Sequence, residues 1–209
     1  NNIVSDNING SGIKVSEGTT NLTDNTISGN TTNSSGAGIY IYNSAATLTG
    51  NTIQGNTAQG NGGGIYLQEV YGGATLTGNT ISGNSSNYRG GGVYLEWGTV
   101  TLTGNTISQN SGAGFYCNYA QKMTASGNTL SENTANNNDQ TAGFYLNSAE
   151  SGSGSVFENN LIANNKSGSR AVFVNTLNVS FKNNTLRDNQ TDYDLYFNLG
   201  NANTLNFEN

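Results

Sequence analysis

One nine-residue module constrains this chain more than any other feature. Its pattern is L-x-x-N-x-I-x-x-N, with constant internal spacing, whereas the start of one copy lies 23 to 32 residues from the start of the next. Variation in length is therefore confined to loops. A repeat of this period is the signature of a solenoid, in which each repeat covers the hydrophobic face of its neighbour. The copies occupy residues 22–30, 48–56, 76–84 and 102–110, with weaker ones at 125–133, 157–165 and 181–189.

A second recurring element begins with glycine and alternates aliphatic and aromatic residues, as at residues 38–41, 64–67 and 92–95. A period of two is typical of a β-strand with one face inward and one outward. Strands that recur once per repeat, without paired Asn-Gly turn signals at fixed places, stack most simply in parallel. We therefore predict an all-β fold: a parallel β-helix with three faces and about eight rungs, forming one domain over residues 1–209.

The alternation also predicts which side chains stack in the core and at one corner. Asn tolerates left-handed backbone angles and hydrogen-bonds neighbouring backbone, so the Asn between the two apolar positions of the module should form a ladder at a corner. The predicted ladder is Asn25, Asn51, Asn79, Asn105, Asn128, Asn160 and Asn184. The predicted core columns are Ile39/Ile65/Val93/Phe115/Phe144/Val172/Leu195, Ile41/Leu67/Leu95/Cys117/Leu146/Val174/Phe197, Leu22/Leu48/Leu76/Leu102 and Ile27/Ile53/Ile81/Ile107/Leu130/Ile162/Leu186.

Together the two elements resemble the right-handed parallel β-helix proteins, and within them the bacterial surface repeats of the polymorphic outer-membrane-protein type. That type pairs a G-G-A-I element with an F-x-x-N element. Here residues 62–65 (GGGI) and 90–93 (GGGV) stand for the first, and residues 81–84 (ISGN) for the second. Ile replaces Phe and Gly replaces Ala. The resemblance covers nearly the whole chain and implies a right-handed coil, as expected for parallel crossovers, in a secreted or cell-surface protein.

The amino-acid composition of the chain argues against several classes of partner and cofactor. Seven Lys and Arg against thirteen Asp and Glu give a net charge of −6, so no basic stripe is present for nucleic acid. There is no His, and the single Cys117 falls on an inward position, which indicates a core residue. No calcium nonapeptide repeat or Cys/His ligand spacing occurs. We expect no metal, no cofactor, no nucleic acid and no membrane-spanning segment.

Outward positions of the glycine-initiated strand form an aromatic column, which either braces the sheet or serves as a platform for sugar rings or a partner chain. Additional aromatic and charged residues gather near its middle, where ring faces beside amides and carboxylates would suit a neutral polysaccharide. The column is Tyr40, Tyr66, Tyr94, Tyr116, Tyr145, Phe173 and Tyr196. The candidate ligand-binding set is Tyr66, Gln68, Glu69, Tyr71, Tyr88, Arg89, Tyr94, Glu96, Trp97, Tyr116 and Tyr119.

Two other activities stay open. Glu69 and Glu96 fall on neighbouring rungs and could form the acid pair of a β-helix polysaccharide lyase or glycosidase. The missing His removes the commonest general base, and the Asp residues are scattered, so we assign no catalytic residue and lean against an enzyme. Outward Thr pairs at residues 47–49, 75–77 and 101–103 resemble the T-x-T arrays of ice-binding β-solenoids.

The expected role is a structural or adhesive rod that presents its aromatic face to a glycan or a protein partner, outside the cell or on its surface. The chain begins and ends inside copies of the module. We therefore expect a fragment of a longer protein or a subunit that self-associates through uncapped strand ends.

Overall fold

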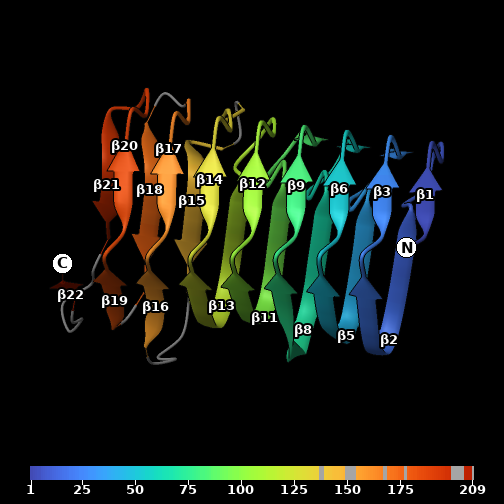
Figure 1. Cartoon of the computed structure of the whole chain (residues 1–209), viewed down its shortest axis with the longest axis horizontal. Helices are drawn as coiled ribbons and strands as arrows, with labels where there is room; N and C mark the ends of the chain where they lie inside the picture. The colour runs from blue at the N-terminus through green and yellow to red at the C-terminus, as the bar shows by residue number, and fades with distance from the viewer. Residues whose placement is uncertain (137–138, 149–153, 167–168, 177, 199–204, 209) are drawn as a thin grey trace.

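The computed structural model describes residues 1–136, 139–148, 154–166, 169–176, 178–198 and 205–208, and Figure 1 shows them as a stack of parallel strands. No helix occurs in these ranges. One sheet stacks the three-residue strands formed by the second half of each module. Its members are β1 (Ile3–Ser5), β3 (Thr26–Ser28), β6 (Thr52–Gln54), β9 (Thr80–Ser82), β12 (Thr106–Ser108), β14 (Thr129–Ser131), β17 (Leu161–Ala163) and β20 (Thr185–Arg187).

The second sheet contains longer strands that bend at a corner and so form two faces of the coil. In the first rungs each strand runs unbroken from the glycine-initiated segment into the start of the module. These strands are β2 (Ile13–Thr23), β5 (Ile39–Thr49), β8 (Ile65–Thr77), β11 (Val93–Thr103) and β13 (Phe115–Ser126). In the later rungs the two halves are separate strands: β15 (Thr141–Asn147), β18 (Arg170–Asn175) and β21 (Tyr193–Phe197) before the corner, β16 (Ser155–Glu158), β19 (Val179–Lys182) and β22 (Leu205–Glu208) after it.

Eight strands stack on each main face, which confirms the predicted parallel β-helix and its rung number. A short fourth ladder, which the sequence analysis missed, lies between the module and the next glycine-initiated strand. It consists of β4 (Thr31–Thr32), β7 (Thr57–Ala58) and β10 (Ser85–Ser86), and isolated bridges such as Ser111↔Thr134 extend it. Two-residue strands carry too little periodicity to be recognised in a sequence.

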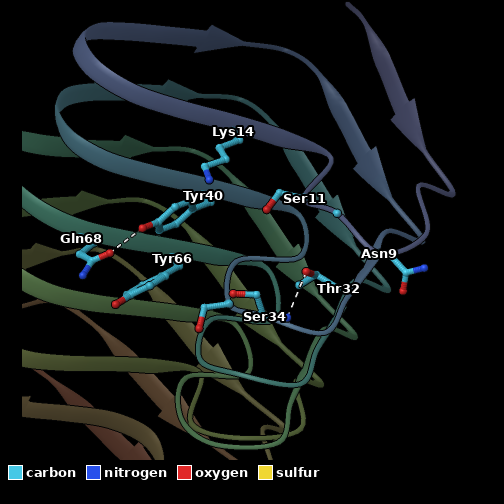
Figure 2. A pocket seen from close by; sticks show the side chains of 10 residues that line it. Asn9, Ser11, Lys14, Thr32, Ser34, Tyr40, Tyr66 and Gln68 are labelled. Atoms are coloured by element: carbon cyan, nitrogen blue, oxygen red, sulfur yellow. Dashed lines mark hydrogen bonds between the residues drawn. The ribbon is translucent and has the colours of Figure 1, made fainter.

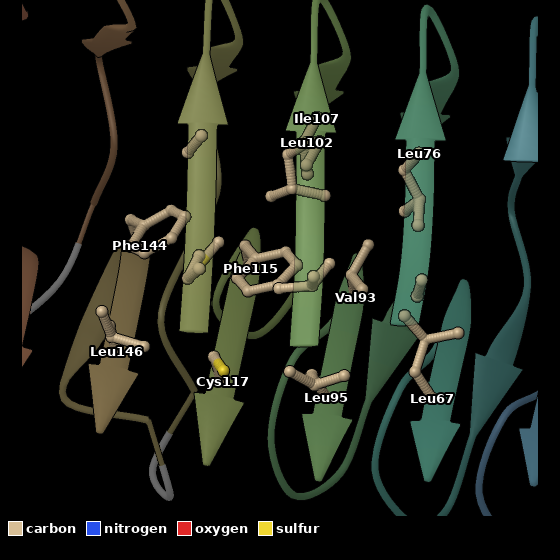
Figure 3. Packing of buried hydrophobic residues seen from close by; sticks show 14 of the residues in the cluster. Leu67, Leu76, Val93, Leu95, Leu102, Ile107, Phe115, Cys117, Phe144 and Leu146 are labelled. Atoms are coloured by element: carbon tan, nitrogen blue, oxygen red, sulfur yellow. The ribbon is translucent and has the colours of Figure 1, made fainter. Parts of the chain in front are cut away.

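Strand register confirms the four predicted core columns. Ile65 pairs with Val93, and Val93 pairs with Phe115. In Figure 3 the side chains of Val93 and Phe115 point into the interior beside Leu95, Leu102 and Ile107. The rings of Phe115 and Phe144 stack with centroids 5.1 Å apart. Cys117 is buried in the same cluster, and burial raises the pKa of its thiol, as expected for a core residue.

The predicted Asn ladder is present and every amide in its middle is fully hydrogen-bonded. The backbone N–H and the side-chain amide of Asn79 both donate to Oδ1 of Asn105, at 2.9 and 3.0 Å. The same Asn79 amide also donates to the carbonyl of Leu48, and its own Oδ1 accepts from Asn51. These bonds use all the side-chain capacity of a buried Asn.

A second, parallel Asn ladder at the next corner was not predicted. It forms between the first sheet and the short ladder, with the same bonding pattern. The sequence signal was available, because this residue is the invariant last position of the module. The ladder consists of Asn7, Asn30, Asn56, Asn84, Asn110, Asn133, Asn165 and Asn189.

Candidate functional site

The aromatic column lies outside the coil, as predicted, but most of it is covered. Tyr66, Tyr94 and Tyr116 are only 7%, 3% and 4% exposed. The loop before the strand lies close to the Cβ end of the tyrosine side chain. Gly62 and Gly90 take left-handed angles there, and a Cβ on either would lie 2.9 Å from the Cβ of Tyr66 or Tyr94. The expectation of an open aromatic face is therefore wrong for the middle of the column, because glycine lets the loop backbone approach this closely.

The rings of the column contact one another from rung to rung, and all of these pairs are stacked except Tyr66 and Tyr94, whose planes are tilted by 56°. Tyr40 and Tyr66 have centroids 5.2 Å apart, and the closest pair, Tyr116 and Tyr145, lies at 4.0 Å with planes 7° apart. The stack continues to Phe173 and Tyr196. Because ring faces contact neighbouring rings, ring edges and hydroxyl groups remain for other partners. Of the two roles expected for the column, bracing of the sheet fits this arrangement, and sugar binding by face-on stacking is blocked where the rings of this aromatic ladder are stacked and buried.

Two polar residues of the candidate set hydrogen-bond the tyrosine hydroxyls. Tyr40 donates to Oε1 of Gln68 at 2.6 Å, and Tyr66 donates to the carboxylate of Glu96. Burial, followed by this bond to Glu96, raises the pKa of Tyr66, and burial raises that of Tyr94 to about 12. Glu96 thus accepts the hydrogen bond that the buried Tyr66 hydroxyl needs.

The candidates Glu69, Trp97 and Tyr119 form a separate group at the corner where the long strands bend. All three have left-handed backbone angles, with φ of 56°, 64° and 61°. The rings of Trp97 and Tyr119 stack at 4.4 Å with planes 14° apart. Trp97 is 36% exposed, and Tyr71, just beyond the bend of β8, is 53% exposed. Non-glycine residues with positive φ are uncommon and mark positions where the fold imposes strain.

The remaining two candidates belong to the loop before β11, at the opposite end of the strand face from the corner. Tyr88 is exposed, and the guanidinium of Arg89 lies 5.1 Å from the centroid of Tyr116. The eleven candidates therefore divide into the aromatic ladder with its polar partners, the corner group and this loop.

A cleft opens at the first rungs of the aromatic ladder. It has a volume of about 460 Å³ and lies between Tyr40, Tyr66 and Gln68 on one side and the loops at residues 9–11 and 32–35 on the other. In Figure 2, Lys14 lies above the Tyr40 ring, and its Nζ is 5.2 Å from the ring centroid. Ser34 borders the cleft, and its backbone N–H donates to the hydroxyl of Thr32.

This cleft contains only two of the predicted candidates, Tyr66 and Gln68. Tyr40 was placed in the aromatic column but left out of the candidate set. No sequence pattern marked Lys14, Ser11 or Ser34 as binding residues, because they lie in the first rung and in a loop outside the repeated module.

Comparison with known proteins agrees with this geometry. A family model described as "Right handed beta helix region" matches residues 1–150 and, in a second overlapping match, residues 63–209. The chain belongs to this family. No curated protein and no solved structure matches the chain. The family assigns the coil its right-handed sense.

The threonine face of this right-handed β-helix is regular over a few rungs only. Thr47, Thr75, Thr101 and Thr124 are in register, but the next partner is Val156. The column formed by the second Thr of each pair continues with Ser126 and then with Glu158. The flat array is therefore short.

The described residues of the β-helix contain no group of three or more His, Cys, Asp or Glu placed to hold a metal ion. They also contain no helix that would be long and apolar enough to span a membrane.

Proposed function

We propose that this β-helix is a non-catalytic structural or adhesive module that binds a neutral glycan in the cleft beside Tyr40 and Tyr66. The observation that carries the proposal is the composition of that cleft. Its walls combine two phenol groups with the amide of Gln68, the hydroxyls of Ser11 and Ser34 and a single ammonium, Lys14. Its volume of about 460 Å³ lies in the range of small-ligand sites. Sugar hydroxyls need donors and acceptors of this kind.

An extracellular or cell-surface location is part of the proposal. It is supported by the resemblance to polymorphic outer-membrane-protein repeats and by the richness in Asn, Thr, Ser and Gly. A coil whose rungs are joined by two Asn ladders and an aromatic ladder would be a stiff carrier for an adhesive site.

A glycan array tests the proposal. The wild-type chain should bind a defined set of neutral glycans, and Gln68→Ala and Ser34→Ala should each weaken that binding by about tenfold, since each removes a hydrogen bond to the ligand. Trp97→Asn is the matched control, because it removes the aromatic ring at the distant corner and keeps a residue that tolerates a left-handed angle. Loss of binding in the control alone would move the site to the corner group.

Three alternative roles are measured in the same samples. Release of reducing ends from bound glycans, abolished by Glu96→Gln, would indicate a carbohydrate-active enzyme acting near Glu69, Glu96 and Trp97. Thermal hysteresis would indicate ice binding by the short threonine face. Growth of rods with concentration, followed by light scattering, would indicate end-to-end assembly.

A further inference from the structure

A second, smaller pocket lies farther along the same face, at the later rungs of the aromatic ladder. Its volume is about 260 Å³. Arg89 from the loop before β11, Thr141 at the start of β15 and Arg170 at the start of β18 line it, together with Gln140 and the rings of Tyr145 and Phe173. Thr141 and Arg170 are register partners on adjacent rungs. The pocket is therefore built mainly from strand starts and ring edges, which are fixed by the stack.

The two arginines are held in place by the aromatic ladder. The guanidinium of Arg89 lies 5.1 Å from the ring centroid of Tyr116, and that of Arg170 lies 5.0 Å from Phe173 and 4.7 Å from Tyr196. Tyr145 stacks between Tyr116 and Phe173, so the two guanidinium groups flank it. Stacking on rings fixes the planes of guanidinium groups and preserves their charge and donors.

The charge of the pocket is opposite to that of the chain. Two of the three arginines line it, whereas the whole chain has a net charge of −6. Among the described residues that line the pocket there is no carboxylate. The nearest acid in sequence, Asp139, interacts electrostatically with Arg89 and offsets part of its charge, while its Oδ2 accepts the backbone N–H groups of Gly90 and Ala113.

A buried hydroxyl in the wall of the pocket adds an independent observation. Thr141 is 1% exposed, and its Oγ1 has no hydrogen-bond partner among the described residues. A buried polar group without a partner costs free energy, so such groups are rare unless a ligand or water satisfies them. The Thr141 hydroxyl is a donor that an anionic oxygen in this pocket would satisfy.

We propose that this pocket binds the carboxylate group of a small anionic ligand. A planar guanidinium group matches the planar, two-oxygen geometry of a carboxylate, and this pocket is lined by two of them, Arg89 and Arg170. The 260 Å³ volume admits one acidic residue of a larger ligand or a small free acid. The site is separate from the cleft beside Tyr40 and Tyr66 and does not depend on the function proposed for that cleft.

Chemical-shift mapping on the isotope-labelled wild-type chain tests the site without relying on a variant. Acetate and glucuronate are the charged probes, and glucose is the neutral counterpart of glucuronate. Shifts should concentrate at Thr141, Tyr145 and Arg170, saturate with probe concentration and weaken in added salt. Binding of both acids indicates a general carboxylate site, and binding of glucuronate alone indicates a sugar acid. Absence of saturable shifts with either acid, or equal binding of glucose, overturns the proposal.

Variants then test the arginines. Arg89→Gln and Arg170→Gln should each weaken binding of the acid by at least about tenfold, because each removes a charged hydrogen-bond donor. Arg187→Gln is the charge-matched control, since Arg187 is exposed and pairs with Asp188 away from the pocket. Arg170→Lys retains the charge and most of the stem packing, and should bind more weakly than wild type while its melting temperature is kept. Sulfate that binds as tightly as acetate, or equal loss in the control, overturns the assignment to a carboxylate.

Discussion

At the scale of single residues, the turns of this coil depend on left-handed backbone angles. One corner uses Gly50, Gly78 and Gly104 in successive rungs, with Asp24 in the rung before them. The corner between the two halves of the long strands uses bulkier residues in the same conformation, including Glu69. A left-handed angle costs an L-residue with a Cβ roughly 1–2 kcal/mol. Stability is therefore lowered locally where Glu69, Trp97 and Tyr119 lie.

Glu69→Asn should raise the free energy of unfolding by about 1 kcal/mol, because Asn tolerates the left-handed region and already occupies the equivalent position of the previous rung as Asn43. Chemical denaturation of both chains measures the difference. Glu69→Gln removes the same charge without favouring the left-handed angle. If the free energy of unfolding rises equally in both variants, the cause is the lost charge and not relief of backbone strain.

At the scale of elements, the segment before β15 is fastened to earlier rungs by polar contacts. The Asn136 side chain donates to the carbonyl of Ser86, and Asp139 accepts from Gly90 and Ala113. Burial raises the pKa of Asp139 from 3.8 to about 6, although these two backbone bonds and Arg89 oppose the rise. The carboxyl is thus held where its charged form is disfavoured.

The raised pKa of Asp139 predicts that stability falls as pH rises from about 4 to 6. The folded state binds the proton more tightly than the unfolded state, so the stabilisation is complete below the unfolded pKa of 3.8 and is lost as pH passes 6. A shift of about two units corresponds to about 3 kcal/mol. Denaturation from pH 3.5 to 7 measures the slope. The Asp139→Asn variant should no longer show this dependence of the unfolding free energy on pH. An unchanged dependence in that variant would assign it to another titrating group.

The Asn ladder is the second element whose contribution is open to measurement. Asn105→Ala removes the acceptor of the Asn79 backbone N–H and of the Asn79 side-chain amide, and it removes the side-chain donor to the Leu76 carbonyl. We expect a loss of about 3 kcal/mol or more, since each unsatisfied buried group costs about 1–3 kcal/mol. The neighbouring Thr106→Ala should change stability little, because Thr106 is exposed. Similar losses in the two variants would show that the ladder adds no special stability.

The columns could be predicted from the sequence and the covered surfaces could not. Side chains alternate between the inside and the outside of each strand, and the spacing within each module is constant. The columns that contain Ile81 and Asn105 therefore follow from spacing alone. The burial of Tyr94 depends on the loop that carries Gly90, and loop length varies from rung to rung. The cleft beside Tyr40 and Tyr66 likewise combines residues of different rungs, such as Ser34 and Gln68. The pocket lined by Arg89 and Arg170 also takes residues from loops and strand starts of different rungs.

At the scale of the whole molecule, the coil is close to a linear array in which rungs contact their neighbours, and the segment before β15 also reaches two rungs back, where Asp139 accepts from Gly90. The first and last described rungs have one neighbour each, and Ile3, Ile8 and Tyr193 are exposed there at 78%, 80% and 56%. The central rungs, formed by β8, β11 and β13, bury their core residues completely or nearly so. Stability in such an array is close to a sum of rung and interface terms.

Amide hydrogen exchange in the 209-residue chain should therefore be slowest in β8 and β11 and become faster toward β1 and β21, because outer rungs can open without breaking the inner ones. Mass spectrometry of exchanged peptides measures the gradient. Equal protection along the coil would indicate a single cooperative unit and contradict this expectation.

The two Asn ladders also give the rod a direction. In every described step the side-chain oxygen points toward the preceding rung, as Oδ1 of Asn51 does toward Asn25 and Oδ1 of Asn56 toward Asn30. Each side-chain amide has a dipole comparable to the roughly 3.5 D of a peptide unit, and the aligned carbonyls add along two parallel rows instead of cancelling. The two rows therefore contribute a dipole along the rod, and the positive end of this contribution lies at the last rungs. Such a particle orients in an applied field, and transient electric birefringence would record its rotation as a permanent rather than an induced moment.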